Sequence, residues 1–183
     1  MKKKFWLLLS ITIISFKPIG GIIGTMFPNM ECEDYNGKKV SLPSETKGKY
    51  TLLGMAFSNK SEEDLKTWMN PIYNKFIAEK AGDPFDPTIE YDINLYFIPM
   101  FTGANQLTSK QSKEKIRAAT AKEMYANILF YEGSKTYKEE LDFEKRDIPY
   151  FFVLDKTGKI TYATSGKYEP SKLDKILDII EEN

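Results

Sequence analysis

Few residues of this chain could do nucleophilic or metal chemistry. The 183-residue sequence has a single cysteine, Cys32, and no histidine. Without histidine, Ser-His and Cys-His nucleophile pairs and histidine metal ligands are excluded. A lone cysteine also excludes an intramolecular disulfide. We therefore expect no metal and no other cofactor, and one thiol is left for catalysis.

The neighbours of Cys32 are unfavourable for a reactive thiol. Glu31, Glu33 and Asp34 surround it in the sequence. Carboxylates raise the pKa of a nearby thiol, whereas a catalytic thiol needs a lowered pKa. The pattern favours a small, half-buried strand residue. A thiol-dependent enzyme that uses Cys32, either a peroxidase or an oxidoreductase, stays open as the alternative.

The chain is organised around residues 49–70. An apolar segment over residues 50–57 is typical of a buried parallel strand. Ser61 and the acidic run 62–64 predict the N-terminus of a helix, with Ser61 as the N-cap. A helix N-terminus stabilises a thiolate, so a redox Cys-x-x-Cys would be placed here. The corresponding residues 60–63 contain no cysteine.

The helix after this junction has a wide apolar stripe and one proline. Leu65, Trp68 and Ile72 recur at spacings of three and four, which predicts a face packed on the core. Pro71 removes a backbone hydrogen bond inside the helix and predicts a kink. Residues 108–124 have a helical composition but a weak stripe, so we expect that segment to be exposed and comparatively mobile.

The other elements are two hairpins, further strands and a last helix. Asn36-Gly37 predicts a tight turn within residues 27–42. The second hairpin begins after Pro149 and turns at residues 155–158. Further segments predict a strand within residues 89–101, a short strand at 128–131, a helical turn at 137–143 and a helix over 169–182.

Composition sets broad limits on the class of protein. With 42% hydrophobic residues, the chain can form a globular domain with one sizeable core. There are 26 basic and 26 acidic residues, without the clustered positive charge of a nucleic-acid surface. We therefore expect a single domain that does not bind nucleic acid.

The N-terminus predicts export. Lys2, Lys3 and Lys4 precede an apolar run over residues 5–16 that is too short to span a bilayer. We expect residues 1–24 to be a signal peptide or an N-terminal anchor and residues 25–183 to be the domain. The predicted location is the periplasm or cell envelope, and an uncleaved segment would associate the protein with the membrane.

Three segments resemble a known superfamily. FPNMECEDYNGKKVSLP, GKYTLLGMAFS and DIPYFFVLDKTGKITYATSG resemble the thioredoxin superfamily with a peroxiredoxin-like N-terminal hairpin, from Met26 to the end. The resemblance implies an α/β thioredoxin-like fold: a central mixed β-sheet flanked by helices, with an N-terminal hairpin extension. It also implies that Ile148-Pro149 lies beside the junction and that this peptide bond is cis.

Within the superfamily, the chain resembles the ATP synthase assembly factor family known from mitochondria. That family lacks Cys-x-x-Cys and carries a Phe-Ser loop and a helix with Trp and Pro, here Phe57-Ser58, Trp68 and Pro71. The resemblance implies a redox-inactive protein that binds a protein or an extended peptide, as a binding protein or an assembly factor. The candidate docking surface comprises Ser58, Asn59, Lys60, Ser61, Glu62, Glu63, Ile148 and Pro149, and ordinary solvated surface is the alternative reading.

Overall fold

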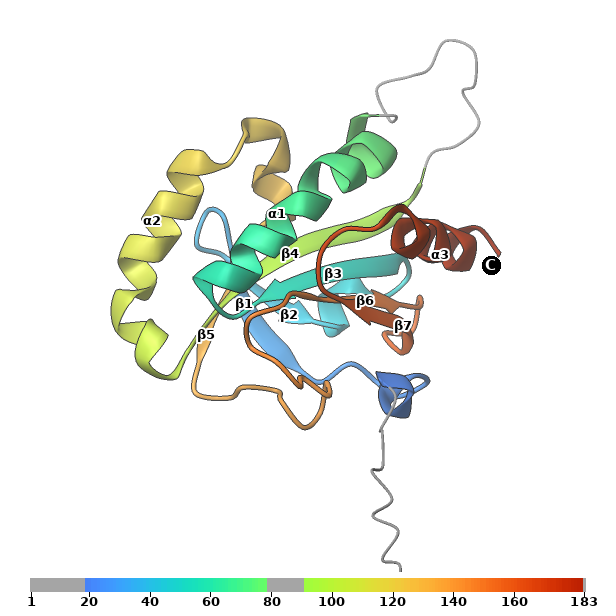
Figure 1. The fold of residues 1–183 in the computed structure, drawn as a ribbon, viewed down its shortest axis with the longest axis horizontal. Helices are drawn as coiled ribbons and strands as arrows, with labels where there is room; N and C mark the ends of the chain where they lie inside the picture. Colours follow the sequence, from blue (N-terminus) through green and yellow to red (C-terminus); the bar gives the residue numbers. More distant parts are fainter. Residues whose placement is uncertain (1–18, 79–90, 183) are drawn as a thin grey trace, which may run out of the picture.

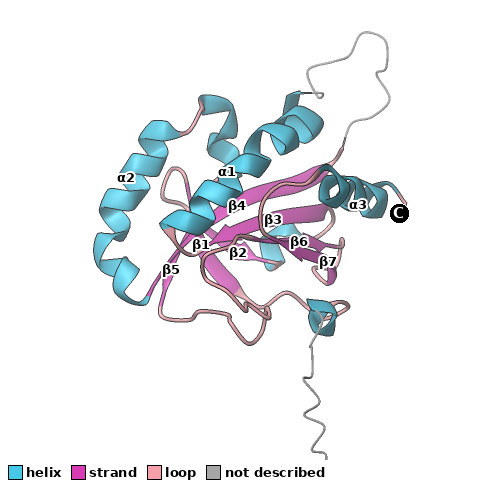
Figure 2. Ribbon diagram, in the orientation of Figure 1, coloured by secondary structure: helices cyan, strands magenta, loops and turns pink. Residues whose placement is uncertain are grey.

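A computed structural model of the chain describes residues 19–78 and 91–182 (Figure 1). Most of the predicted signal or anchor segment lies outside these residues. Seven strands form one mixed sheet in the order β2-β1-β5-β4-β3-β6-β7, with helices packed on it (Figure 2). This confirms the predicted fold class. Within the described residues no helix is long and apolar enough to cross a membrane.

The centre of the sheet is the strand predicted from residues 50–57. All seven residues of β3 (Tyr50–Ala56) are buried. β3 pairs in parallel with β4 (Ile93–Thr102) and antiparallel with β6 (Tyr150–Leu154). Gly54 leaves room for the Phe151 ring, since a Cβ there would lie 2.7 Å from a ring carbon.

Both predicted hairpins are present. β1 (Met30–Asp34) and β2 (Lys39–Leu42) pair antiparallel across a turn in which Gly37 has φ of 90°. β6 pairs antiparallel with β7 (Ile160–Ser165). The first hairpin joins the sheet because β1 also pairs with β5 (Leu129–Gly133), which in turn lies parallel to β4.

The helices lie mainly on one face of the sheet. α1 (Asn59–Tyr73) and α3 (Pro170–Glu181) bury Trp68 and Ile176 against alternate strand residues such as Leu52. α1 passes into a π-helical segment, Asn74–Ala78, three residues after Pro71. The α-helical hydrogen bonding therefore changes close to the proline that the sequence marked as a helix distortion.

A loop covers much of the opposite face. Between β5 and β6 the chain contributes Tyr137, Leu141 and Phe143 to a second core cluster, which also contains Leu53 and Cys32. The predicted helical turn at residues 137–143 is a series of turns. The 3-10 helix η1 (Ile19–Ile22) adds Ile22 to the same cluster. This face is thus closed largely by irregular structure rather than by a helix.

Candidate binding site at the carboxyl end of the sheet

α1 begins three residues earlier than the sequence predicted. Its N-cap is Ser58, whose hydroxyl accepts a hydrogen bond from the Ser61 amide at 3.2 Å. The Ser61 hydroxyl accepts from the amides of Phe57 and Ser58, each at 2.8 Å. The prediction of Ser61 as N-cap was wrong, because a serine pair three residues apart forms a capping box and the helix starts at its first member.

The junction residues divide into buried and exposed groups. Ser61 is 0% exposed and its hydroxyl is fully used, so Ser61 cannot offer itself to a partner. Asn59, Lys60 and Glu63 are exposed, and Glu62 is half-buried. Of the sequence-predicted junction surface, the exposed and half-buried residues remain available for docking.

Ser58 joins the helix start to the chain that leads into β6. Its hydroxyl lies 3.0 Å from Oδ1 of Asp147 and 3.2 Å from the Arg146 carbonyl oxygen, and both are acceptors. Ile148 follows directly and is half-buried, while Pro149 is buried. Ser58 therefore brings the start of α1 into contact with residues 146 and 147, directly before Ile148-Pro149.

The bond before Pro149 is trans, so the prediction of a cis bond there was wrong. Among the described residues the cis peptide bond precedes Pro43. At Pro149 the carbonyl oxygen accepts a hydrogen bond from the Gly166 amide at 2.9 Å, and Ser58 holds the preceding residues. The chain therefore makes its contacts at the junction with the trans isomer, which is the more stable form of an X-Pro bond.

Ile148 has an unused backbone. Its N–H and C=O make no hydrogen bond to any other residue in the part of the chain that the structure describes. An unpaired backbone beside a helix start can pair with an extended peptide by strand addition. Ile148 thus offers both its N–H and its C=O to a partner.

A small pocket of about 270 Å³ adjoins the junction, at the carboxyl ends of β3 and β4. Its floor includes the rings of Phe57 and Phe143, whose centroids are 4.6 Å apart. Thr102, the last residue of β4, also lines it. The remaining lining residues are Thr136, Lys138, Glu144, Lys145 and Arg146. Ligands of α/β sheets commonly bind at this edge.

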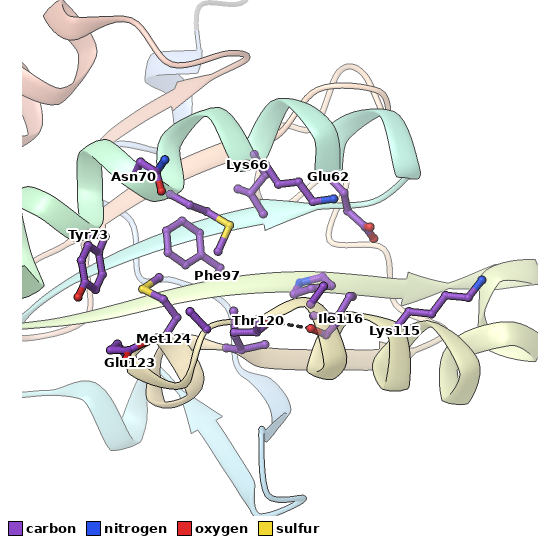
Figure 3. Close-up of a pocket in the computed structure, with 16 residues that line it drawn as sticks. Glu62, Lys66, Asn70, Tyr73, Phe97, Lys115, Ile116, Thr120, Glu123 and Met124 are labelled. Carbon is purple, nitrogen blue, oxygen red and sulfur yellow. Dashed lines mark hydrogen bonds between the residues drawn. The ribbon is translucent and has the colours of Figure 1, made fainter.

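A larger groove of about 750 Å³ runs between α1 and α2 (Ser109–Ala119). Figure 3 shows Phe97 at its floor, with Met124 and Ile116 opposite α1. Glu62, from the predicted docking surface, lines this groove rather than the small pocket. Burial raises the pKa of the Glu62 carboxyl, and the charge of Lys66 partly offsets that rise.

α2 is anchored to the sheet by a charged cluster. Lys113 is only 8% exposed and lies 3.1 Å from carboxylate oxygens of both Glu33 and Glu132. Arg117 adds an ion pair to Glu33 at 3.0 Å and donates to the Tyr35 carbonyl oxygen. The predicted helix in this segment is confirmed over residues 109–119. Its polar face is held to the sheet by ion pairs, which the weak apolar stripe in the sequence did not indicate.

Cys32 lies in β1, in the core. It is 3% exposed and pairs across the hairpin with Val40. Burial raises the pKa of its thiol to about 12, so the thiolate is scarce at neutral pH. The sequence anticipated the raised pKa from neighbouring acids, whereas desolvation is the cause in the structure.

The residues that the sequence reading missed lie in the loop before β6 and at the end of β4. Thr102, Lys145 and Arg146 line the small pocket, yet none belongs to a recognisable motif. One signal was present: Ser58 and Ser61 have the spacing of a Cys-x-x-Cys pair and stand at the helix start. The serines, rather than residues 60–63, are therefore the better counterparts of redox cysteines.

Comparisons with solved structures show a thioredoxin-like fold. The C-terminal domain of a thiol-disulfide oxidoreductase from Bacteroides thetaiotaomicron has TM-score 0.55 and 18% identity, over 88% of this chain and 97% of that chain. The lipoprotein thioredoxin Etrx1 from Streptococcus pneumoniae has TM-score 0.55 and 20% identity, over 85% and 100%. BsSco, of the Sco family of cytochrome c oxidase assembly proteins, has TM-score 0.57 and 18% identity, over 86% and 92%.

Sequence comparison gives the family. A search of curated proteins finds no match. A protein-family model described as ATP10 protein matches residues 24–182, which is nearly the whole of the domain described above. The chain therefore belongs to the ATP10 protein family, with a thioredoxin-like fold and serines at the start of α1.

Proposed function

We propose that this chain is a redox-inactive assembly factor that binds a protein partner at the carboxyl end of its sheet. The observation that carries the proposal is the start of α1, where Ser58 and Ser61 cap the helix in place of thiols. Neither hydroxyl can replace a thiol in disulfide exchange, which requires attack by a thiolate. The one cysteine is buried and its pKa is raised, which disfavours the alternative of a thiol-dependent enzyme.

The family supports the assembly role. The matching model is described as ATP10 protein, and the sequence resembles an ATP synthase assembly factor family, so ATP synthase is the complex whose assembly we propose. BsSco, which shares only the fold, is described as a member of a family of cytochrome c oxidase assembly proteins. A thioredoxin-like fold is therefore compatible with assembly of a membrane complex.

The proposed docking surface comprises Asn59, Lys60, Glu63, and the Ile148 backbone. The first three are exposed, and Ile148 has an unpaired main chain. Strand addition gives affinity through main-chain hydrogen bonds, while the side chains at the helix start give specificity. We further propose that the protein works at the cell envelope, because Lys2 to Lys4 and the apolar run favour export or anchorage.

Two experiments test the proposed function. Insulin reduction and peroxide consumption should show no turnover, with the Cys32→Ser variant as the control. Turnover that disappears in that variant would restore the enzyme alternative. In cells that lack the protein, native gels of membranes should show less assembled ATP synthase, and the wild-type gene should restore it. Unchanged ATP synthase in those cells would refute the assembly role.

Location has its own test. Cell fractionation should recover the protein from the envelope or periplasm, with a cytosolic enzyme and a periplasmic enzyme as markers. A variant in which Lys2, Lys3 and Lys4 are replaced by Glu should be exported less, since the positive n-region directs the segment. Recovery of the wild-type chain only from the cytosol would contradict the envelope proposal.

A further inference from the structure

The small pocket beside the junction combines an apolar floor with a cationic rim. Phe57 and Phe143 are each 5% exposed, and their rings meet edge to face. Lys138, Lys145 and Arg146 line the same pocket. An aromatic floor accepts an apolar side chain, and cations beside it accept an anion.

Thr102 supplies an unused polar group. The residue is 2% exposed, and its hydroxyl makes no hydrogen bond within the described part of the chain. No side-chain nitrogen or oxygen that is sealed from solvent lacks a partner among the described residues. The Thr102 hydroxyl is therefore open to the pocket that it lines, where it can donate to an incoming oxygen.

The charges of the rim are not balanced. Lys138, Lys145 and Arg146 form no ion pair with the residues that the structure describes, and Glu144 is the one carboxylate among the lining residues. The lining residues therefore carry three positive charges and one negative charge, and Asp142 and Asp147 lie in the same loop. Glu144 weakens the attraction of the lining residues for an anion, because its carboxylate repels the anion and attracts the neighbouring cations.

Size and position restrict the ligand. A volume of about 270 Å³ is slightly below the roughly 300–1,000 Å³ of drug-sized ligand sites. It suits a group the size of one amino-acid residue. The backbone of Arg146 is held to α1 by Ser58, and Ile148, with its unpaired main chain, follows two residues later. An extended peptide paired with Ile148 would thus pass close to the pocket, which can take its last residue.

We propose that this pocket binds the C-terminal residue of a partner chain, with an apolar side chain on the rings and the carboxylate on Thr102 and the cations. The inference rests on the proposed protein-binding function and deepens it. A free organic acid of similar size offers the same chemistry, so the test must separate these two sources.

Binding of short peptides to the purified chain tests the pocket directly. The probe is N-acetyl-Gly-Ser-Leu-Phe, measured by calorimetry as the free acid and as the C-terminal amide. The acid should bind about tenfold more tightly, the scale expected for a charge-assisted hydrogen bond. Thr102→Val should reduce that difference several-fold without abolishing it, because the lining cations still favour the acid. Thr102→Ser, which keeps the hydroxyl, should preserve the full difference.

Charge variants and a small acid complete the test. The Lys145→Gln/Arg146→Gln double variant should weaken binding of the acid several-fold at low salt, and the control Lys110→Gln, on exposed α2, should not. Equal binding of acid and amide, or no effect of Thr102→Val, would overturn the proposal. N-acetylphenylalanine binding as tightly as the peptide would overturn the peptide source and assign the pocket to a free acid.

The outcome is distinguishable from failure of the proposed function. If Thr102→Val restores ATP synthase assembly in cells as well as the wild type does and the peptide does not bind, the pocket inference is wrong and the assembly role stands. If the peptide binds as expected but cells without the protein assemble ATP synthase normally, the pocket inference stands and the assembly role falls.

Discussion

Replacing Ser58 by alanine should loosen both the start of α1 and the loop before β6. The hydroxyl accepts from the Ser61 amide at 3.2 Å and lies 3.0 Å from Oδ1 of Asp147. Ser58→Ala removes both contacts in one step. The remaining Ser61 hydroxyl still accepts from the amides of Phe57 and Ser58, so the helix start should weaken without being lost.

The size of the effect follows from the two contacts. Loss of an N-cap serine costs about 1 kcal/mol. Loss of the exposed hydrogen bond to the Asp147 carboxylate costs about 1 kcal/mol more. The free energy of unfolding should therefore fall by about 2 kcal/mol in Ser58→Ala. For a domain of this size, that corresponds to a melting temperature lower by about 4–8 °C.

A double-mutant cycle separates the two contributions. Urea unfolding of the wild type, Ser58→Ala, Asp147→Ala and the double variant should give a coupling of about 1 kcal/mol between the two residues. Ser112→Ala, in α2, is the matched control and should change stability by under about 0.5 kcal/mol. A loss below about 0.5 kcal/mol in Ser58→Ala, or additive effects of the two variants, would refute the link between α1 and the loop.

Three further predictions concern the charged cluster under α2 and the core. Lys113→Met should destabilise the fold by about 2 kcal/mol at pH 7, less than the roughly 3–5 kcal/mol for a fully buried pair, because Glu33 and Glu132 are partly exposed. Burial tends to raise the pKa of the Glu132 carboxyl, but hydrogen bonds from Lys113 and Ser109 lower it overall. The stability that the ionised Glu132 contributes is therefore present above its unfolded pKa and is lost as the pH falls through its folded pKa. The melting temperature of Lys113→Met should accordingly fall less steeply than that of the wild type as the pH is lowered. The same fall in both proteins would contradict this.

The thiol of Cys32, with its pKa raised to about 12 by burial, should react with a disulfide reagent only on unfolding. The stability that the protonated thiol contributes should be complete below its unfolded pKa of about 8.5 and be lost as the pH rises toward 12. Cys32→Ala should remove this dependence of stability on pH. Rapid labelling of the folded chain at pH 7 would disprove the burial argument. Trp68→Phe keeps a ring against Phe151 but removes the 2.9 Å hydrogen bond to the Gly166 carbonyl oxygen, so urea unfolding should show a loss of about 1–2 kcal/mol, and an unaltered midpoint would count against that bond.

The central sheet could be predicted from the sequence because its signals are local. The apolar run over β3, the Asn36-Gly37 turn and the Pro-led hairpin each specify an element within about 20 residues. The capping serines were also visible as a pair, but the choice between Ser58 and Ser61 depends on where β3 ends. That end is set by long-range pairing with β4 and β6.

The small pocket could not be predicted because its parts are far apart in sequence. Phe57, Thr102 and Phe143 come from the end of β3, the end of β4 and an irregular loop. The loop has no periodicity, so its apolar residues gave no sign of the face that they cover. Likewise, the contact of Lys113 with Glu33 joins α2 to a hairpin 80 residues earlier in the chain.

Position-specific photo-crosslinking tests the central claim most directly. A photoreactive residue at Asn59, beside the junction, is compared with one at Lys175 on α3, which lies toward the other end of the sheet (Figure 1). In cells that express each variant, Asn59 should crosslink to an ATP synthase subunit and Lys175 should not. Crosslinks to that subunit from Lys175 alone, or none from Asn59 in a variant that supports normal assembly, would contradict docking at the carboxyl end of the sheet.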